Sequence, residues 1–278
     1  MDPSVIHSPR HPLALAVAGL HDRAQRRAAH LVLAEGPHLL VEGLQAGWDL
    51  VTCLYTPDWA DGEGNARLLV RARGQACPVA PAGWPRPGLV AAVSDRVMMR
   101  MASTDTPQGV LSVFAVRPVA PEVAGGSVLV LDRLQDPGNV GALARTALAF
   151  CGPDLRLLCD RLGADPYGPK VLRASAGAVF RLGITESADL PGEVARLGQA
   201  GVHFWALVPD GGQPLSRELV RPGPFGLIVG NEGAGIAPDL QALGTPVSIP
   251  VRGPVESLNA AVAGAIALFA LTQWMARM

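Results

Sequence analysis

The second half of the chain carries a series of short, nearly continuous apolar segments, and these constrain the fold more than any other feature. They are SVLVL (127–131), LRLLC (155–159), HFWALV (203–208), FGLIVG (225–230) and VSIP (247–250). Strands that are apolar at every position are buried on both faces, and the intervening helical segments are typical of a parallel sheet covered by helices on both sides. Ligands of such sheets bind beyond the carboxyl ends of the strands, so we expect a site among the loops 132–139, 230–235 and 250–257.

A break in composition divides the chain in two. The segment RPVAPEVAGGS (117–127) is rich in proline, ends in paired glycines and lacks periodicity, which indicates a linker. Before it we expect a small α/β domain, with strands at 30–35, 50–56 and 109–116 and a helix at 37–47. The predicted organisation of the 278 residues is a first domain over 1–117, a linker over 118–126 and a second domain over 127–278.

The charge balance gives the chain no overall attraction to nucleic acid, because the formal net charge is -1. Any nucleic-acid partner must then be held by a local basic surface. One helical stripe in HDRAQRRAAH (21–30) offers such a surface, with basic residues at i, i+3, i+4 and i+7 and small residues on the other side. The stripe consists of Arg23, Arg26, Arg27 and His30, and the domain is expected to lie against Ala24, Ala28 and Leu31. An ordinary solvated helix face is the alternative.

Metal, membrane and export signals are weak. The four cysteines form no CxxC pair, and no histidine spacing suits a helical metal site, so we predict no metal. The segment 257–275 approaches the length of a membrane span but contains Asn259, Thr272 and Gln273, which favours a buried terminal helix. The apolar segment LALAVAGL (13–20) is short and no convincing cleavage site follows it, so we expect no signal peptide and a soluble, cytoplasmic protein.

The loop 132–139 leads into a helix that carries one arginine. Pro137 and Gly138 fix a turn, Asn139 can cap the helix, and Arg145 follows on a face of small apolar residues. In the loop GNEGAG (230–235), Glu232 would repel a phosphate, so that loop suits a neutral or cationic ligand or an arginine partner. A solvated glycine turn is the alternative for this loop.

The third loop leads into the terminal helix. Ser257 is a good N-cap, and Asn259 would then occupy the first turn. Capping explains the serine but not the asparagine, because asparagine is a poor helix former.

Together these stretches resemble the SpoU (TrmH-like) class of RNA 2′-O-ribose methyltransferases. The three matching motifs are DPGNVGALARTALAF (136–150), LIVGNEGAGI (227–236) and IPVRGPVESLNAAVAGA (249–265), and an intervening segment, DPYGPKVLRASAGAVFRL (165–182), also matches. Three motifs in order at fitting spacing are specific, and they cover the whole second half. The first half is similar to the substrate-binding domain of many members, through residues 26–44 and 106–114.

The resemblance implies a catalytic domain with a Rossmann-like parallel sheet and a C-terminal trefoil knot, a homodimer, and an RNA substrate. It implies S-adenosylmethionine as the cofactor, with its adenine near Gly230, Ile249 and Leu258. The catalytic positions that it implies are Arg145, Asn139, Glu232, Ser257 and Asn259, and Lys170 and Arg173 are further candidates for RNA contacts.

In the family, the arginine that matches Arg145 is assigned to activate the ribose hydroxyl. A free guanidinium has a pKa far above neutral and is a poor base. We therefore favour an Arg145 that binds the target phosphate and stabilises the developing alkoxide, kept charged by a pair with Glu232.

Other functions remain open at this point. The two-domain layout favours ribosomal RNA over tRNA as the substrate. A non-catalytic RNA-binding protein is opposed by the intact catalytic positions, and a nucleotide-dependent oxidoreductase by Glu232 and the absence of a true GxGxxG.

Overall fold

A computed structural model describes residues 5–78, 83–117, 126–255 and 257–276. The chain forms two compact units, and the division does not follow the linker alone. One unit comprises Met1–Pro118 and Tyr167–Phe180, and the other comprises Val119–Pro166 and Arg181–Met278. The predicted linker over 118–126 lies outside the described residues except for Gly126.

The first unit is built on a four-stranded mixed sheet in the order β1-β4-β2-β3. Its strands are β1 (Leu31–Glu35), β2 (Leu50–Tyr55), β3 (Leu89–Ala92) and β4 (Val110–Ala115). Strands β1 and β2 run antiparallel to β4, and β3 runs parallel to β2. Every residue of β1 is buried, because helices cover both faces of this sheet.

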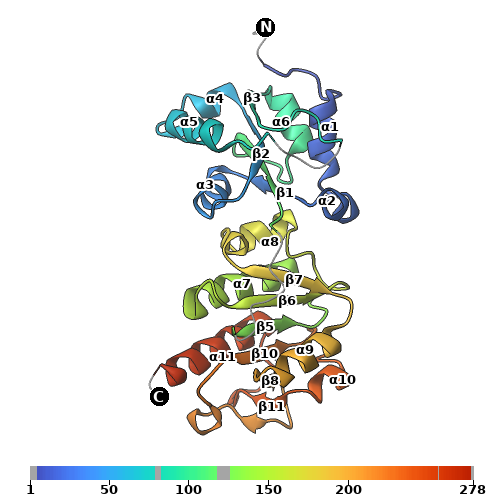
Figure 1. Cartoon of the computed structure of the whole chain (residues 1–278), viewed down its shortest axis with the longest axis vertical. Helices are drawn as coiled ribbons and strands as arrows, with labels where there is room; N and C mark the ends of the chain where they lie inside the picture. The colour runs from blue at the N-terminus through green and yellow to red at the C-terminus, as the bar shows by residue number, and fades with distance from the viewer. Residues whose placement is uncertain (1–4, 79–82, 118–125, 256, 277–278) are drawn as a thin grey trace. The chain divides into compact units, whose positions relative to one another are not determined.

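Two helical layers enclose the sheet of the first unit (Figure 1). The helices are α1 (Pro12–Gly19), α2 (Arg23–Ala29), α3 (Pro37–Gln45), α4 (Pro57–Ala60), α5 (Asn65–Gln75), α6 (Asp95–Met101), α8 (Pro169–Ala174) and the short η1 (Ala178–Phe180). Helices α1 and α6 pack together on one face, where Leu13, Val17, Val97 and Met101 are fully buried. Helices α3, α4 and α5 lie on the other face.

The segment Tyr167–Phe180 completes the first unit although it comes late in the chain. The indole Nε1 of Trp48 donates to the Phe180 carbonyl at 2.8 Å, and their rings meet edge to face at 5.0 Å. Gly177 has a φ of +81°, and a Cβ there would lie 2.8 Å from the Glu42 Cβ, so only glycine fits this approach. Lys170 and Arg173 therefore belong to the first unit, whereas the sequence assigns everything after 127 to the second domain.

The second unit contains a seven-stranded sheet in the order β7-β6-β5-β10-β8-β11-β9, and all pairings are parallel. Its strands are β5 (Val128–Leu131), β6 (Arg156–Asp160), β7 (Gly183–Ser187), β8 (His203–Leu207), β9 (Gln213–Pro214), β10 (Phe225–Val229) and β11 (Thr245–Ser248). The predicted α/β class with a parallel sheet in the second half of the chain is confirmed. Strand β7 was not predicted, because only Ile184 in it is buried and no apolar run marks it.

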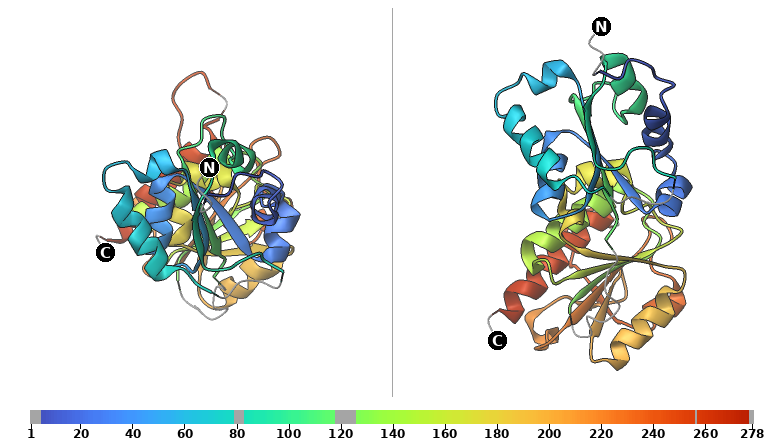
Figure 2. Two further views of the ribbon diagram at one scale, coloured as in Figure 1. Left: turned by 90° about the horizontal axis from the view of Figure 1, so that it is seen from above. Right: turned by 45° about the horizontal axis from the view of Figure 1, so that its top comes forward.

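Helices lie on both faces of this sheet, as Figure 2 shows from a second direction. The helices of the unit are α7 (Pro137–Cys151), α9 (Leu190–Gln199), η2 (Arg217–Leu219), α10 (Pro238–Gln241) and α11 (Ala260–Met275). Helices α7 and α11 pack against each other, and a Cβ on Gly264 would lie 2.5 Å from Leu143 Cδ2, which shows how closely they approach. Helices α9 and α10 cover the opposite face around Val194 and Leu240.

Helix α11 begins at Ala260, three residues after the predicted start at 257, and is part of this packing. In the portion of the chain that the structure describes, no helix has the length and apolarity needed to cross a bilayer.

Candidate active site

Three segments of the second unit follow parallel strands and so reach the same edge of the sheet. Residues 132–139 follow β5, residues 230–235 follow β10, and the chain from 249 follows β11; β5 and β10 are direct neighbours. Polar side chains of the three segments meet there. Hydrogen bonds join Glu232 to Asn139 and Asn139 to Asn259, which is the convergence that the motif positions predict.

Asn139 has a tertiary role rather than the capping role expected from the sequence. Asp136 caps α7, since its Oδ1 accepts from the Gly138 backbone N at 2.8 Å. Asn139 lies within the first turn, and only 8% of its surface is exposed. Because Asp136 supplies the cap, the Asn139 amide makes tertiary hydrogen bonds instead. It donates from Nδ2 to Glu232 Oε1 at 2.8 Å and accepts at Oδ1 from Asn259 Nδ2 at 3.1 Å.

Asn259, not Ser257, caps the terminal helix. Its Oδ1 accepts from the backbone N of Ala261 at 2.9 Å and of Val262 at 3.2 Å, and its Nδ2 remains available for Asn139. The expected cap at Ser257 is wrong, since that residue is exposed and precedes the helix. An amide can cap a helix with its oxygen and donate elsewhere with its nitrogen, which explains an asparagine at the point where capping alone would favour serine.

Glu232 is held as an ionised carboxylate. It accepts from Asn139 Nδ2 and from the backbone N atoms of Gln135 at 3.3 Å and Asp136 at 3.4 Å. Partial burial raises the pKa of the Glu232 carboxyl, but the hydrogen bonds from Asn139 and from backbone amides outweigh it and hold that pKa below its usual range. The loop after β10 therefore carries a negative charge in a fixed position, and its hydrogen bonds hold the start of α7 in place.

Arg145 lies on the exposed face of α7, while Leu143 and Ala144 beside it are buried. In the described residues its guanidinium forms no ion pair, because the Glu232 carboxylate is directed to Asn139 and the loop amides. The expected pair between Glu232 and Arg145 is not formed. As far as the described residues show, the guanidinium is available to an anion from outside the chain.

The three residues expected at the cofactor follow β10 and β11. A Cβ on Gly230 would lie 2.4 Å from the backbone C of Gly235, so the loop can close on itself only with glycine there. Asn231 and Gly235 exchange two backbone hydrogen bonds of 3.0 Å, which make this loop compact. Ile249 and Leu258 are half-buried apolar residues on the connection from β11 to α11.

Two polar residues that the sequence analysis did not select organise these loops. The Asp132 carboxylate is 2% exposed; its Oδ2 accepts from the Ala237 backbone N at 2.7 Å, and its Oδ1 pairs with Arg133 Nε at 2.8 Å. That pair raises the pKa of Arg133. Asn231 Nδ2 donates to the Arg133 carbonyl at 2.8 Å, which ties the loop after β10 to the loop after β5. Asp132 could have been selected from the sequence, because it is a charged residue directly after the apolar run 127–131.

Helix α2 does not form the predicted basic stripe. Arg26 is only 6% exposed, and its Nη1 donates to the carbonyls of Leu20 at 2.6 Å and His21 at 2.7 Å. His30 lies beyond the helix end with a φ of 50°. Ala24 and Ala28, expected to face the domain, are exposed. The arginine side of the helix is turned inward because the uncapped carbonyls after α1 need donors.

The other selected cations lie in the first unit. Arg23 and Arg27 are half-buried on α2, and Lys170 and Arg173 are exposed on α8. Arg173 Nη1 donates to Ser103 Oγ at 2.5 Å.

The described residues contain no group of three or more side chains that could hold a metal ion. Burial raises the pKa of the Cys53 and Cys151 thiols to about 12, which disfavours the nucleophilic thiolate at neutral pH.

Comparison with known proteins gives consistent matches for both halves. A sequence profile of the SpoU rRNA Methylase family matches residues 126–269, and a profile described as an MRM3-like substrate binding domain matches residues 15–112. A Synechocystis protein described as an uncharacterized tRNA/rRNA methyltransferase is 34% identical over 99% of this chain and 96% of its own length. The Bacillus subtilis 23S rRNA (guanosine(2553)-2′-O)-methyltransferase RlmP is 30% identical over 91% of this chain and 92% of its own.

Solved structures agree with the sequence matches. The AdoMet-bound rRNA methyltransferase from Sinorhizobium meliloti superposes with a TM-score of 0.78 and 26% identity, covering 97% of this chain and 98% of that chain.

Proposed function

The chain belongs to the SpoU rRNA methylase family, and on that premise we propose that it transfers a methyl group from S-adenosylmethionine to a ribose 2′-hydroxyl in ribosomal RNA. One observation carries the proposal. The hydrogen-bonded series Glu232–Asn139–Asn259 connects the family's three motifs at the carboxyl edge of the sheet. A non-catalytic RNA-binding protein would have no need for this fixed polar arrangement.

The residues at this edge fit the cofactor by charge and by shape. When bound, S-adenosylmethionine supplies an activated methyl group on a cationic sulfonium. A fixed, ionised Glu232 suits a cation and disfavours the phosphates of a dinucleotide, which argues against the oxidoreductase alternative. The compact backbone at Gly230 and the apolar side chains of Ile249 and Leu258 would hold the adenine.

Arg145 acts on the RNA in this proposal. Its exposed guanidinium binds the phosphate next to the target ribose and stabilises the negative charge that develops on the 2′-oxygen. Asn139, Glu232 and Asn259 hold the start of α7, and with it Arg145, in a fixed orientation. Ser257 remains a candidate for direct substrate contact, because it is exposed beside the Asn259 cap.

The proposal also includes a homodimer. Val262, Ile266 and Phe269 follow one another at i, i+4 and i+7 on α11 and are 49%, 41% and 49% exposed. Phe150 on α7 meets Phe269 edge to face at 5.2 Å and is itself 44% exposed. An apolar patch over two neighbouring helices suits a second copy of the chain. Sedimentation should show a dimer at micromolar concentration and a monomer for Phe269→Asp.

The proposal also covers the RNA substrate, the roles of the two domains, the knot and the location of the protein. Ribosomal RNA is favoured over tRNA by the substrate-binding unit and by the named target of the B. subtilis relative. We further propose RNA capture by residues 1–117 and catalysis by 127–278, a trefoil knot around the connection from β11 to α11, and a cytoplasmic location.

The proposed reaction is tested with tritiated S-adenosylmethionine and total RNA from cells that lack the gene. We expect label in ribosomal RNA, recovered after digestion as a 2′-O-methylated nucleoside. Label in tRNA would support the alternative substrate, label on a base would refute ribose methylation, and absence of label with folded protein would refute the activity.

A further inference from the structure

Leu162 is a largely exposed apolar side chain beside the candidate active site. Its exposed fraction is 74%, the highest value among the large hydrophobic residues of the described chain. It lies in the loop that follows β6, and we name residues Asp160–Ala164 the Leu162 loop. Since β6 is the neighbour of β5, this loop reaches the same edge of the sheet as Glu232 and Asn139.

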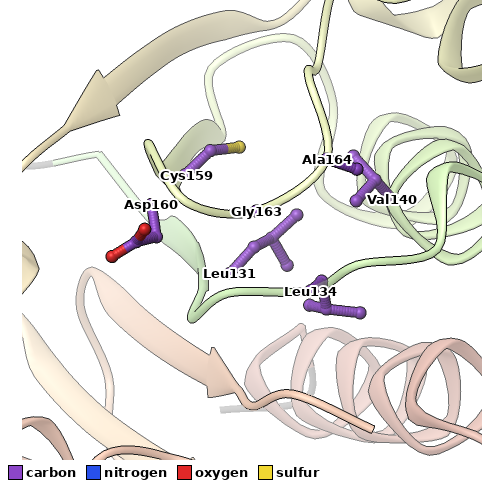
Figure 3. Close-up of a pocket in the computed structure, with 7 residues that line it drawn as sticks. All are labelled: Leu131, Leu134, Val140, Cys159, Asp160, Gly163 and Ala164. Atoms are coloured by element: carbon purple, nitrogen blue, oxygen red, sulfur yellow. The ribbon is translucent and has the colours of Figure 1, made fainter.

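The backbone of the Leu162 loop is fixed, so the exposure of the leucine does not come from a loose loop. The Leu162 backbone N donates to Asp160 Oδ1 at 2.5 Å, and the Ala164 N donates to the Leu134 carbonyl at 2.7 Å. A Cβ on Gly163 would lie 2.9 Å from that same carbonyl oxygen, so the loop rests directly on the segment after β5. Figure 3 shows Gly163 and Ala164 above the apolar side chains of Leu131 and Leu134.

Gln135 connects the Leu162 loop to the Glu232 carboxylate. Gln135 donates from Nε2 to the Leu162 carbonyl at 3.1 Å and from its backbone N to Glu232 Oε2 at 3.3 Å. The position of Leu162 is therefore set by the same hydrogen-bond network that sets Glu232. A side chain placed in this way is suited to contact the substrate close to the reacting ribose.

Arg161 adds a positive charge next to this apolar group. Its side chain is exposed and forms no ion pair within the described residues, while its backbone N is fixed to the Ser187 carbonyl at 3.0 Å. An apolar side chain beside a free guanidinium matches the two chemistries of RNA, a base face and a phosphate.

We propose that Leu162 packs against an unstacked nucleobase next to the methylated nucleotide, with Arg161 on the adjoining phosphate. The leucine is a positioning residue: by occupying the place of a stacked neighbour it keeps the target ribose turned toward Glu232 and Arg145. This inference rests on the proposed RNA methylation and goes beyond it by naming the element that engages the bases.

The test compares Leu162→Ala, Leu162→Asp and Leu162→Met, using total RNA from cells that lack the gene as substrate. We expect the KM for RNA to rise about tenfold in the alanine variant and further in the aspartate variant, and methionine to restore it, since it refills the apolar volume. The affinity for S-adenosylmethionine and the melting temperature should stay unchanged. Leu243→Ala is the matched control, because Leu243 is 39% exposed in the same unit but precedes β11, at the opposite edge of the sheet.

A second measurement distinguishes direct contact of Leu162 with a nucleobase from an indirect effect on RNA binding. A photo-crosslinking amino acid at position 162 should link to a nucleotide adjacent to the methylated one. An unchanged KM in the alanine and aspartate variants, or crosslinks distant from the methylated nucleotide, would overturn the proposal. Dissociation of the dimer by Leu162→Asp would instead assign the leucine to a second copy. A parent protein that methylates no RNA would refute the proposed function itself.

Discussion

Helices α2 and α7 each carry arginine, yet they use it in opposite ways. On α2, Arg26 is buried, and its guanidinium donates to the Leu20 and His21 carbonyls after α1. On α7, Arg145 is exposed, and within the described chain it forms no ion pair. An arginine can bind an external phosphate only where neither backbone carbonyls nor carboxylates already occupy its donors. Arg26 is therefore a structural residue, and Arg145 is available for chemistry.

Loss of Arg145 should have the largest effect. Arg145→Ala removes the proposed contact to the phosphate and to the developing alkoxide, and we expect methyl transfer to fall by about 100-fold or more. Cofactor affinity, measured by calorimetry, should remain within a few-fold of the parent, because the expected adenine-contacting residues follow other strands. Turnover above roughly a tenth of the parent rate would contradict this role.

Loss of Arg26 should affect stability instead. Arg26→Ala leaves two carbonyls without their donor, and we expect the free energy of unfolding, measured in urea, to fall by about 1–3 kcal/mol. The matched control is Arg67→Ala, an exposed arginine on α5 of the same unit, which should change it by less than about 0.5 kcal/mol. Equal effects of the two substitutions would remove the distinction between a structural and a surface arginine.

Glu232→Gln tests whether the hydrogen bonds at the start of α7 hold Arg145 in place. The glutamine keeps the size of the side chain but cannot accept from Asn139 and two amides as a carboxylate does, so turnover should drop about tenfold with little change in melting.

Because folding lowers the pKa of Glu232, its ionised form contributes stability above the ordinary glutamate pKa, and that contribution is lost as pH falls through the lower folded-state value. Glutamine does not titrate, so any loss of turnover that protonation of Glu232 causes at low pH should be absent in the variant. An undiminished rate would contradict a role for Glu232 in orienting Arg145.

The smallest effect concerns the rest of α2. Arg26 is used internally, whereas Arg23 and Arg27 are half-buried on α2. If these two also contact phosphates in the complex, replacing both with Gln should lower the log–log salt slope of RNA binding by about 1.5 units. Filter binding over a salt series measures this slope. A slope that does not change would move the search for RNA contacts to Lys170 and Arg173 on α8.

The sequence predicts the parallel sheet and the convergence of the three loops, because both depend on local patterns: apolar runs, and Pro or Gly at strand ends. It does not predict which of several capping residues is used. Asp136 and Asn139, or Ser257 and Asn259, are equivalent as caps, and only the tertiary hydrogen bond between the two asparagines decides between them. The docking of Tyr167–Phe180 on the first unit depends on Trp48, more than 100 residues away in the chain, so no local signal reveals it.

The most direct test of the central claim is a map of ribose methylation in ribosomal RNA from cells that lack the gene, complemented with the parent protein or with Arg145→Ala. The account predicts that one 2′-O-methyl group is missing in the deletion, returns with the parent and does not return with Arg145→Ala, although that variant accumulates as folded protein. An unchanged methylation map in the deletion, or full restoration by Arg145→Ala, would contradict it.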